Sequence, residues 1–129
     1  KIDSIGVGFG VIGELRNAAK RGDHHAQIIG VNVSTNPRDK KKFVNLRAEM
    51  WWNIGREFSS SGSWDLSQME NADAASAQLL WPRWFLDTKG RIQVESKDDI
   101  IKRNGRSPDN ADALLLAYFS GAVPRMRFL

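Results

Sequence analysis

Residues 1–33 read KIDSIGVGFGVIGELRNAAKRGDHHAQIIGVNV and combine two kinds of hydrophobic pattern. Apolar and β-branched side chains dominate 1–7 and 27–33, which predicts two short strands. Between them, Val11, Ile12 and Leu15 recur at helical spacing, and a basic segment ending in a glycine at 20–22 predicts where the helix stops. A strand, a helix and a second strand in succession form a βαβ unit. We therefore expect an α/β domain in which two parallel strands are joined by a right-handed crossover.

Residues 8–13, Gly-Phe-Gly-Val-Ile-Gly, match the pattern G-x-G-x-x-G between the first strand and the helix. Such glycines let backbone N–H groups approach a pyrophosphate at a helix N-terminus. The second strand lacks a terminal acid for a ribose hydroxyl, although Arg38 could meet a 2′-phosphate, and Asp3 has no role in dinucleotide binding. An NADP-binding Rossmann-like domain therefore remains an alternative. The simpler interpretation is that the glycines make a tight turn between strand and helix.

Length and composition set further limits. The chain has 129 residues, so residues 1–129 are expected to form a single domain with a C-terminal tail at 121–129. It has no cysteine, which excludes disulfide frameworks, thiolate zinc sites and cysteine nucleophiles. Its apolar runs are too short for a membrane span. The formal net charge of +4 favours a polyanionic partner. The chain begins at Lys1 without a methionine, and we expect it to be a fragment of a longer protein.

The remaining pattern predicts helices, a hairpin and a basic loop. Pro37 and several basic residues mark a polar loop over 34–42, and Ser/Gly residues mark a mobile segment at 59–63. Trp51 and Trp52 are adjacent on a helix, so one should be buried and the other exposed, whereas Trp81 and Trp84 are expected in the core. The other predicted elements are helices over 43–58, 73–80, 97–104 and 109–119, and a hairpin of strands 83–86 and 91–94.

Three carboxylates stand out as candidate metal ligands. Asp3 lies in an apolar strand at an end where α/β proteins bind ligands, and Asp109 and Asp112 are three residues apart in the first turn of the last helix. Carboxylates from a strand end and a helix start suit Mg²⁺, and a two-ion site can hydrolyse a phosphodiester. The alternatives are that Asp3 faces solvent and that Asp109 favours the helix dipole.

Four segments together resemble one family. They are Asp3–Gly8 (DSIGVG), Asn45–Trp51 (NLRAEMW), Gly90–Ile100 (GRIQVESKDDI) and Gly105–Leu114 (GRSPDNADAL). In this order and spacing they resemble the nuclease domain of bacteriophage terminase large subunits, the enzymes that cut concatemeric viral DNA during packaging. The resemblance covers residues 2 to about 119.

The resemblance implies an RNase H-like mixed sheet flanked by helices, with the N-terminal strands missing from this chain. It implies that Asp3, Asp109 and Asp112 belong to an acidic cluster that binds two Mg²⁺ or Mn²⁺ ions, with Asp109 as the usual helix ligand and Asp112 as a neighbour. A further acid, on the family's first strand, would lie upstream of Lys1, as would the ATPase domain. The glycines after Asp3 would then form a turn that lets DNA or metal approach that residue.

The resemblance also implies the partners. Double-stranded DNA would be the substrate, and the ATPase domain, the small terminase subunit and the portal would be protein partners in the cytoplasm of a bacterial host; no membrane partner is expected. Candidate DNA-phosphate contacts are Arg38, Lys40, Lys41, Lys42 and Lys97. A module that binds DNA or assists assembly without cutting remains an alternative, because one acid of the cluster would be absent.

Overall fold

The computed structural model describes residues 1–60 and 64–120, so the expected C-terminal tail and part of the expected Ser/Gly segment lie outside the described residues. The N-terminal βαβ prediction is confirmed. Strand β1 (Ile2–Asp3) pairs in parallel with β2 (Gly30–Val31), with Ile2 opposite Gly30 and Asp3 opposite Val31. Helix α1 (Val7–Arg21) joins them. Both strands are shorter than the apolar runs at 1–7 and 27–33 suggested.

The glycine segment forms a helix rather than an open turn, which corrects the expectation from the G-x-G-x-x-G pattern. The sharp change of direction occurs at Gly6, whose φ of 61° and ψ of −127° favour glycine, and α1 begins at the next residue. Gly8, Gly10 and Gly13 lie inside that helix. A Cβ built on Gly8 would lie 1.7 Å from the carbonyl oxygen of Asp3, whereas Gly10 and Gly13 face open space. Gly8 therefore allows helix and strand to pack closely, and no phosphate-cradling turn is formed.

The rest of the described chain contains four helices and an antiparallel hairpin, as expected. The elements are α2 (Leu46–Ser60), α3 (Ala72–Leu79), β3 (Trp84–Leu86), β4 (Ile92–Val94), α4 (Lys97–Asn104) and α5 (Asp109–Tyr118). Strands β3 and β4 are antiparallel, and β4 also meets the segment before α2 through a parallel bridge between Phe43 and Ile92. The expected mixture of parallel and antiparallel pairing is therefore present, in two small sheets.

Local signals explain several helix ends. The Asn45 side chain accepts a hydrogen bond from the N–H of Ala48 at 2.9 Å, so α2 begins three residues later than its apolar pattern suggested. Ser96 accepts from the N–H of Asp99, and Gly105 ends α4 with a φ of 75°, as predicted. Pro108 occupies the N-cap of α5 rather than its first turn.

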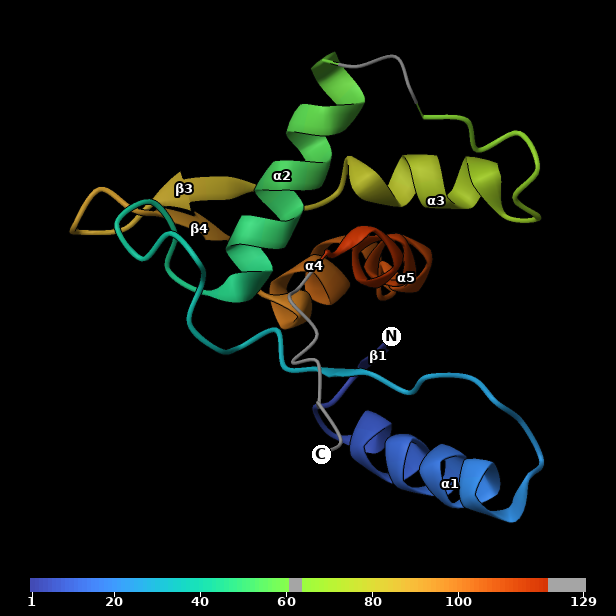
Figure 1. The fold of residues 1–129 in the computed structure, drawn as a ribbon. Coiled ribbons are helices and arrows are strands. Elements are labelled where there is room, and N and C mark those ends of the chain that lie inside the picture. Colours follow the sequence, from blue (N-terminus) through green and yellow to red (C-terminus); the bar gives the residue numbers. More distant parts are fainter. Residues whose placement is uncertain (61–63, 121–129) are drawn as a thin grey trace.

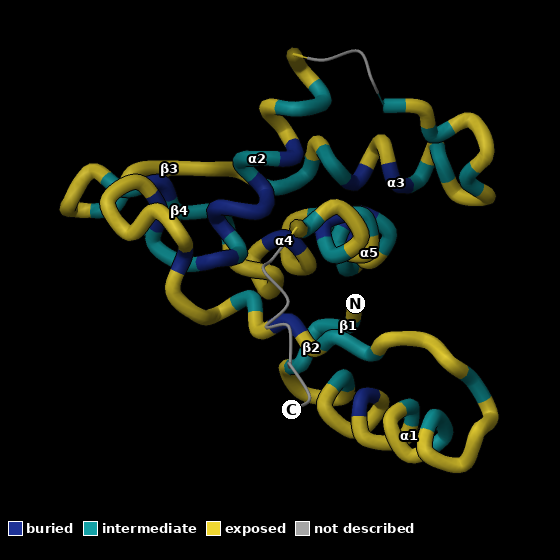
Figure 2. The backbone as a smooth tube through the Cα atoms, viewed as in Figure 1, coloured by how far each residue is buried: buried dark blue, intermediate teal, exposed yellow. Residues whose placement is uncertain are grey.

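The core lies between α2, α5 and β2. Its buried members are Val31, Leu46, Met50, Trp51, Ile54, Ala111 and Leu115. In Figure 1, α4 and α5 lie between the α2–α3 layer and β1, and α1 lies at the edge of the molecule. Figure 2 shows this helix as mostly exposed, and Ile12 is its one buried residue. No described helix has the length and apolar character of a membrane span.

The burial of the tryptophan side chains agrees with the prediction at some positions and not at others. Trp51 is buried at 6% exposure and Trp52 is half-buried, as expected for neighbours on a helix. Trp84, by contrast, is 57% exposed, and its strand neighbours Phe85 and Leu86 are exposed as well. The prediction that Trp84 belongs to the core is therefore wrong. Its strand, β3, has a partner on one side only, so its side chains gain no cover from a second neighbour.

Candidate metal centre on helices α4 and α5

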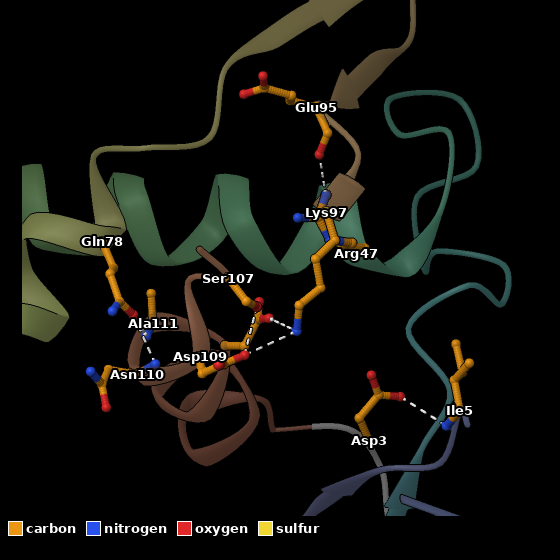
Figure 3. Close-up of polar contacts among 11 residues, drawn as sticks. Asp3, Ile5, Arg47, Gln78, Glu95, Lys97, Ser107, Asp109, Asn110 and Ala111 are labelled. Atoms are coloured by element: carbon orange, nitrogen blue, oxygen red, sulfur yellow. Dashed lines mark hydrogen bonds and ion pairs between the residues drawn. The ribbon is translucent and has the colours of Figure 1, made fainter. Parts of the chain in front are cut away.

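Two of the three predicted acids meet at one lysine. The Nζ atom of Lys97 lies 3.2 Å from an oxygen of Asp109 (Figure 3) and 2.9 Å from an oxygen of Asp112. Lys97 is the first residue of α4, directly after the Ser96 cap, whereas both acids lie in the first turn of α5. The start of α4 is thereby held against the start of α5, and two carboxylates face a single cation.

The electrostatics of this group are coupled. Burial lowers the pKa of Lys97, but hydrogen bonds and charge from Asp112 and then Asp109 outweigh that effect, so the net pKa lies above its ordinary value. The hydrogen bond from the Ser107 hydroxyl, at 2.6 Å, is the main cause of a lowered pKa at Asp109, and Lys97 adds to it. Lys97 is therefore held as a cation and Asp109 as a carboxylate.

The two carboxylates differ in exposure. The side chain of Asp109 is 77% exposed, whereas that of Asp112 is 27% exposed. Arg47, on α2, is the other cation near Asp112: burial lowers the pKa of its guanidinium, and the charges of Asp112 and Glu95 oppose that shift. Asp112 therefore lies deeper, between two cationic side chains. Burial thus favours Asp112 as the more firmly held of the two acids, whereas the family resemblance favours Asp109 as the main ligand.

Asp3 lies on a different part of the fold from the α5 acids. It ends β1, and its Oδ1 accepts a hydrogen bond from the N–H of Ile5 at 3.1 Å, which fixes the turn into α1. Figure 3 draws it on the N-terminal segment, apart from the Lys97 cluster. Within residues 1–60 and 64–120, no three His, Cys, Asp or Glu side chains are grouped so as to hold a metal ion. A site shared by Asp3, Asp109 and Asp112 stays a prediction.

Two residues near the cluster were not anticipated from sequence. Arg47 donates to the backbone carbonyl of Glu95 at 2.5 Å, and its Nη2 atom is buried without a hydrogen-bond partner in the described part of the chain. Gln78, 5% exposed on α3, accepts hydrogen bonds from two N–H groups at the start of α5. Arg47 lies in one of the segments that carry the family resemblance, and a polar residue in the mostly apolar pattern of α3 is the signal that could have marked Gln78.

Glu95 belongs to a separate structural ion pair. Its carboxylate accepts from Arg103 at 2.6 Å, and the same guanidinium donates to the carbonyl of Trp81 at 2.5 Å. The hydrogen bond from Arg103 is the main cause of a pKa below the ordinary value for this glutamate. The pair ties α4 to the hairpin, so Glu95 has a partner outside the α5 cluster.

The basic residues proposed to contact DNA occupy different settings. The guanidinium of Arg38 donates to the carbonyl of Ser120 at 2.6 Å and lies 5.5 Å from the ring centre of Phe119. Lys42 lies over the rings of Phe43 and Trp52, and Lys40 and Lys41 are exposed in the same loop. Lys97 is engaged with the acids. The loop cations therefore form the exposed part of the predicted DNA surface, and their contact with DNA stays a prediction.

Known proteins match this chain in structure and not in sequence. No protein-family model matches the sequence, and no curated protein matches it either. Among solved structures, a point variant of the nuclease domain of the large terminase subunit gp2 of bacterial virus Sf6, with manganese and β-thujaplicinol, superposes with a TM-score of 0.65 at 17% identity. The match covers 88% of this chain and 61% of that one.

Two other structures from the same virus match this chain to a similar extent. The nuclease domain of Sf6 gp2, and a variant of it with calcium, each have a TM-score of 0.62 at 19% identity. Each match covers 88% of this chain and 61% of the other, so the chain spans about three-fifths of the length of the domains that it matches. The resemblance found in the sequence is thereby confirmed at the level of structure: this chain has the α/β, RNase H-like fold of the nuclease domain of a bacteriophage large terminase subunit.

Proposed function

We propose that the chain is part of a metal-dependent endonuclease that hydrolyses phosphodiesters of double-stranded DNA during viral DNA packaging. The observation that carries the proposal is the convergence of Asp109 and Asp112 on one cation at the start of α5, within this fold. The proposal includes three further points. The whole protein would cut DNA as a terminase, its substrate would be concatemeric viral DNA, and it would act in virion assembly of a phage or prophage.

The donor set fits a divalent ion. Mg²⁺ and its analogues prefer oxygen ligands, and Mg²⁺ is commonly held by one or two carboxylates with water and substrate phosphates completing the shell. Asp109 and Asp112 supply two carboxylates whose separation already accommodates a cationic nitrogen between them. Asp3 would supply an oxygen ligand from the end of β1. When bound, one or two Mg²⁺ or Mn²⁺ ions would activate water and stabilise charge on the phosphate.

The chain's own residues would hold and position the reactants. Asp112, with the smaller exposed fraction, would be the anchored ligand, and Asp109 would be the ligand open to solvent and substrate. Lys97 would have to release at least one of the two carboxylates when an ion is bound. The loop cations Arg38, Lys40, Lys41 and Lys42 would bind DNA phosphates without reading sequence. The ATPase domain, the small terminase subunit and the portal, in the cytoplasm of a bacterial host, are the proposed partners.

Manganese binding tests the proposal directly. Crystals of the chain soaked in Mn²⁺ should show anomalous density between Asp109 and Asp112, and shared density with Asp3 would place all three ligands. In solution, Asp112→Asn should weaken Mn²⁺ binding by more than the roughly tenfold that loss of an outer-shell partner costs, because a carboxylate ligand is removed. Asp98→Asn is the matched control, since Asp98 is an exposed acid in the first turn of the neighbouring helix α4.

Cleavage is tested in the full-length protein. Asp3→Asn and Asp112→Asn should each abolish Mn²⁺-dependent cutting of plasmid DNA while leaving the fold intact, as judged by circular dichroism. A cleaving Asp112→Asn variant, or Mn²⁺ affinity equal in Asp112→Asn and wild type, would contradict the proposal. DNA binding that is sensitive to salt but never accompanied by cutting would point instead to a non-catalytic module.

A further inference from the structure

We infer that Gln78 is a positioning residue that fixes the start of α5 and thereby the placement of Asp109 and Asp112. The inference rests on the proposed function, because it assigns Gln78 to the geometry of the same metal centre. It starts from the two hydrogen bonds that this side chain accepts. The Oε1 atom of Gln78 lies 2.8 Å from the backbone nitrogen of Asn110 and 3.2 Å from that of Ala111 (Figure 3).

Helix α5 has no side-chain cap of its own. The first N–H groups of a helix lack partners within the helix, and an N-cap side chain ordinarily accepts from the second or third of them. The N-cap of α5 is Pro108, whose side chain carries no acceptor. Asn110 and Ala111 are the second and third residues of the helix, so Gln78 accepts from the two N–H groups that an N-cap side chain would serve. The cap comes from another helix, α3.

The side chain of Gln78 is closely packed. It is 5% exposed, and Ala75 on its own helix and Ala111 on α5 are both fully buried at 0% exposure. Helices α3 and α5 lie side by side (Figure 1), and the low exposure of Gln78 and its hydrogen bonds to α5 place it where the two helices pack. A side chain held in this way has little freedom to follow a shift of α5. The first turn of α5 is therefore fixed by hydrogen bonding and by close packing together.

The two bonded N–H groups lie between the two acids. Asp109 is the first residue of α5 and Asp112 the fourth, so Asn110 and Ala111 separate them. A rotation or fraying of this turn would displace both carboxylates from Lys97, which belongs to α4. The amide of Gln78 is also neutral, so it satisfies the helix start without adding charge to the acidic cluster. The Asp109 carboxylate interacts with Ser107 and Lys97 instead of acting as the cap.

Two substitutions separate the cap from the packing. Gln78→Met keeps a side chain of similar length but removes the acceptor, whereas Gln78→Glu keeps an oxygen acceptor. Gln68→Met is the matched control at an exposed position. We expect Gln78→Met to weaken Mn²⁺ binding by about tenfold, the lower end of the usual effect of removing an outer-shell partner. Gln78→Glu, which adds a charge, should restore slow amide exchange at Asn110 and Ala111, and Gln68→Met should leave the Mn²⁺ affinity unchanged.

Amide exchange reports the cap independently of metal. In the metal-free chain, Gln78→Met should speed hydrogen exchange at Asn110 and Ala111 and weaken the nuclear Overhauser effect between the side chains of Lys97 and Asp112. All measurements are made well below each variant's melting temperature, so that global unfolding does not contribute. Faster exchange with unchanged Mn²⁺ affinity and an unchanged Lys97–Asp112 signal would overturn the positioning role. If wild type itself does not bind Mn²⁺, the proposed function fails, and the Lys97–Asp112 signal still decides the role of Gln78.

Discussion

At the scale of single residues, ion pairs determine which charged side chains around α4 and α5 already have a partner of opposite charge. Arg103 engages Glu95, Lys97 engages Asp109 and Asp112, and Arg91 engages Asp87. Among these three groups, the one at Lys97 places two acids on one cation. The sequence could indicate the acids, because their spacing in a first helical turn is visible. It could not indicate which acid pairs with Lys97 or Arg103, since those contacts join separate elements.

The Glu95–Arg103 pair should make stability depend on acidity. The pKa of Glu95 is lowered in the folded state, so this carboxylate stabilises the fold above its unfolded pKa, and the contribution disappears as the pH falls through the folded pKa. Arg103→Met should raise the pKa of Glu95 toward its ordinary value and flatten the acid side of the stability curve. Carbon-13 titration and urea unfolding from pH 7 to about pH 3 measure both effects. Lys102→Met, in the same turn of α4, should leave the Glu95 titration in place; equal curves for Arg103→Met and wild type would refute the assignment.

The glycines of the 8–13 segment should respond in opposite directions. Gly8→Ala would place a methyl group 1.7 Å from the Asp3 carbonyl oxygen, so we expect a decrease in stability of about 1–3 kcal/mol from overpacking. Gly10→Ala adds a methyl group in open space within a helix and should stabilise by about 0.5–1 kcal/mol. Urea denaturation followed by circular dichroism measures both. If the two variants change stability by the same amount, the close approach at Gly8 is not what the residue provides.

At the scale of elements, helix boundaries divide into those with local signals and those without. The start and end of α4 follow from Ser96 and Gly105, which act on residues within three or four positions, and both were predicted. The cap of α5 comes from Gln78, 32 residues from Asn110, so no local pattern could indicate it. The lengths of β1 and β2 also escaped prediction, because an apolar run does not show how many residues find a pairing partner.

Removing the local cap of α4 gives a test at this scale. Ser96→Ala should cost about 1 kcal/mol, since the N–H of Asp99 loses its acceptor. Ser96→Asp should recover most of it, because Asp is an equally good cap and its charge suits the helix N-terminus. The free energy of unfolding in urea is the measured quantity. Ser76→Ala, at an exposed position within α3, is the control, and a matching decrease in that variant would remove the cap as the explanation.

At the scale of the whole molecule, the basic surplus should govern affinity for DNA. The exposed cations Lys40 and Lys41 lie in one loop, and removing one lysine–phosphate interaction should reduce the slope of log affinity against log salt by about 0.9. Replacing both by alanine should therefore flatten that slope by up to about 1.8. Fluorescence anisotropy with a duplex at several salt concentrations measures it. Lys89→Ala, in the exposed hairpin turn, is the control; a slope unaffected by the double substitution would place the DNA elsewhere.

The shallow attachment of α1 has a kinetic consequence for how the candidate centre is assembled. Helix α1 buries one residue, Ile12, whereas α2 and α5 share a continuous core with Trp51, Ile54 and Leu115. Weakly buried units open more often than the core to which they are attached. The α5 carboxylates would thus belong to the slow-opening core, to which Asp3 is tied through the pairing of β1 with β2 and its buried Val31, whereas α1 itself would open more often. Opening of α1 would release the turn that follows Asp3, so a centre that includes Asp3 would lose the orientation of that turn before it loses the acids of α5.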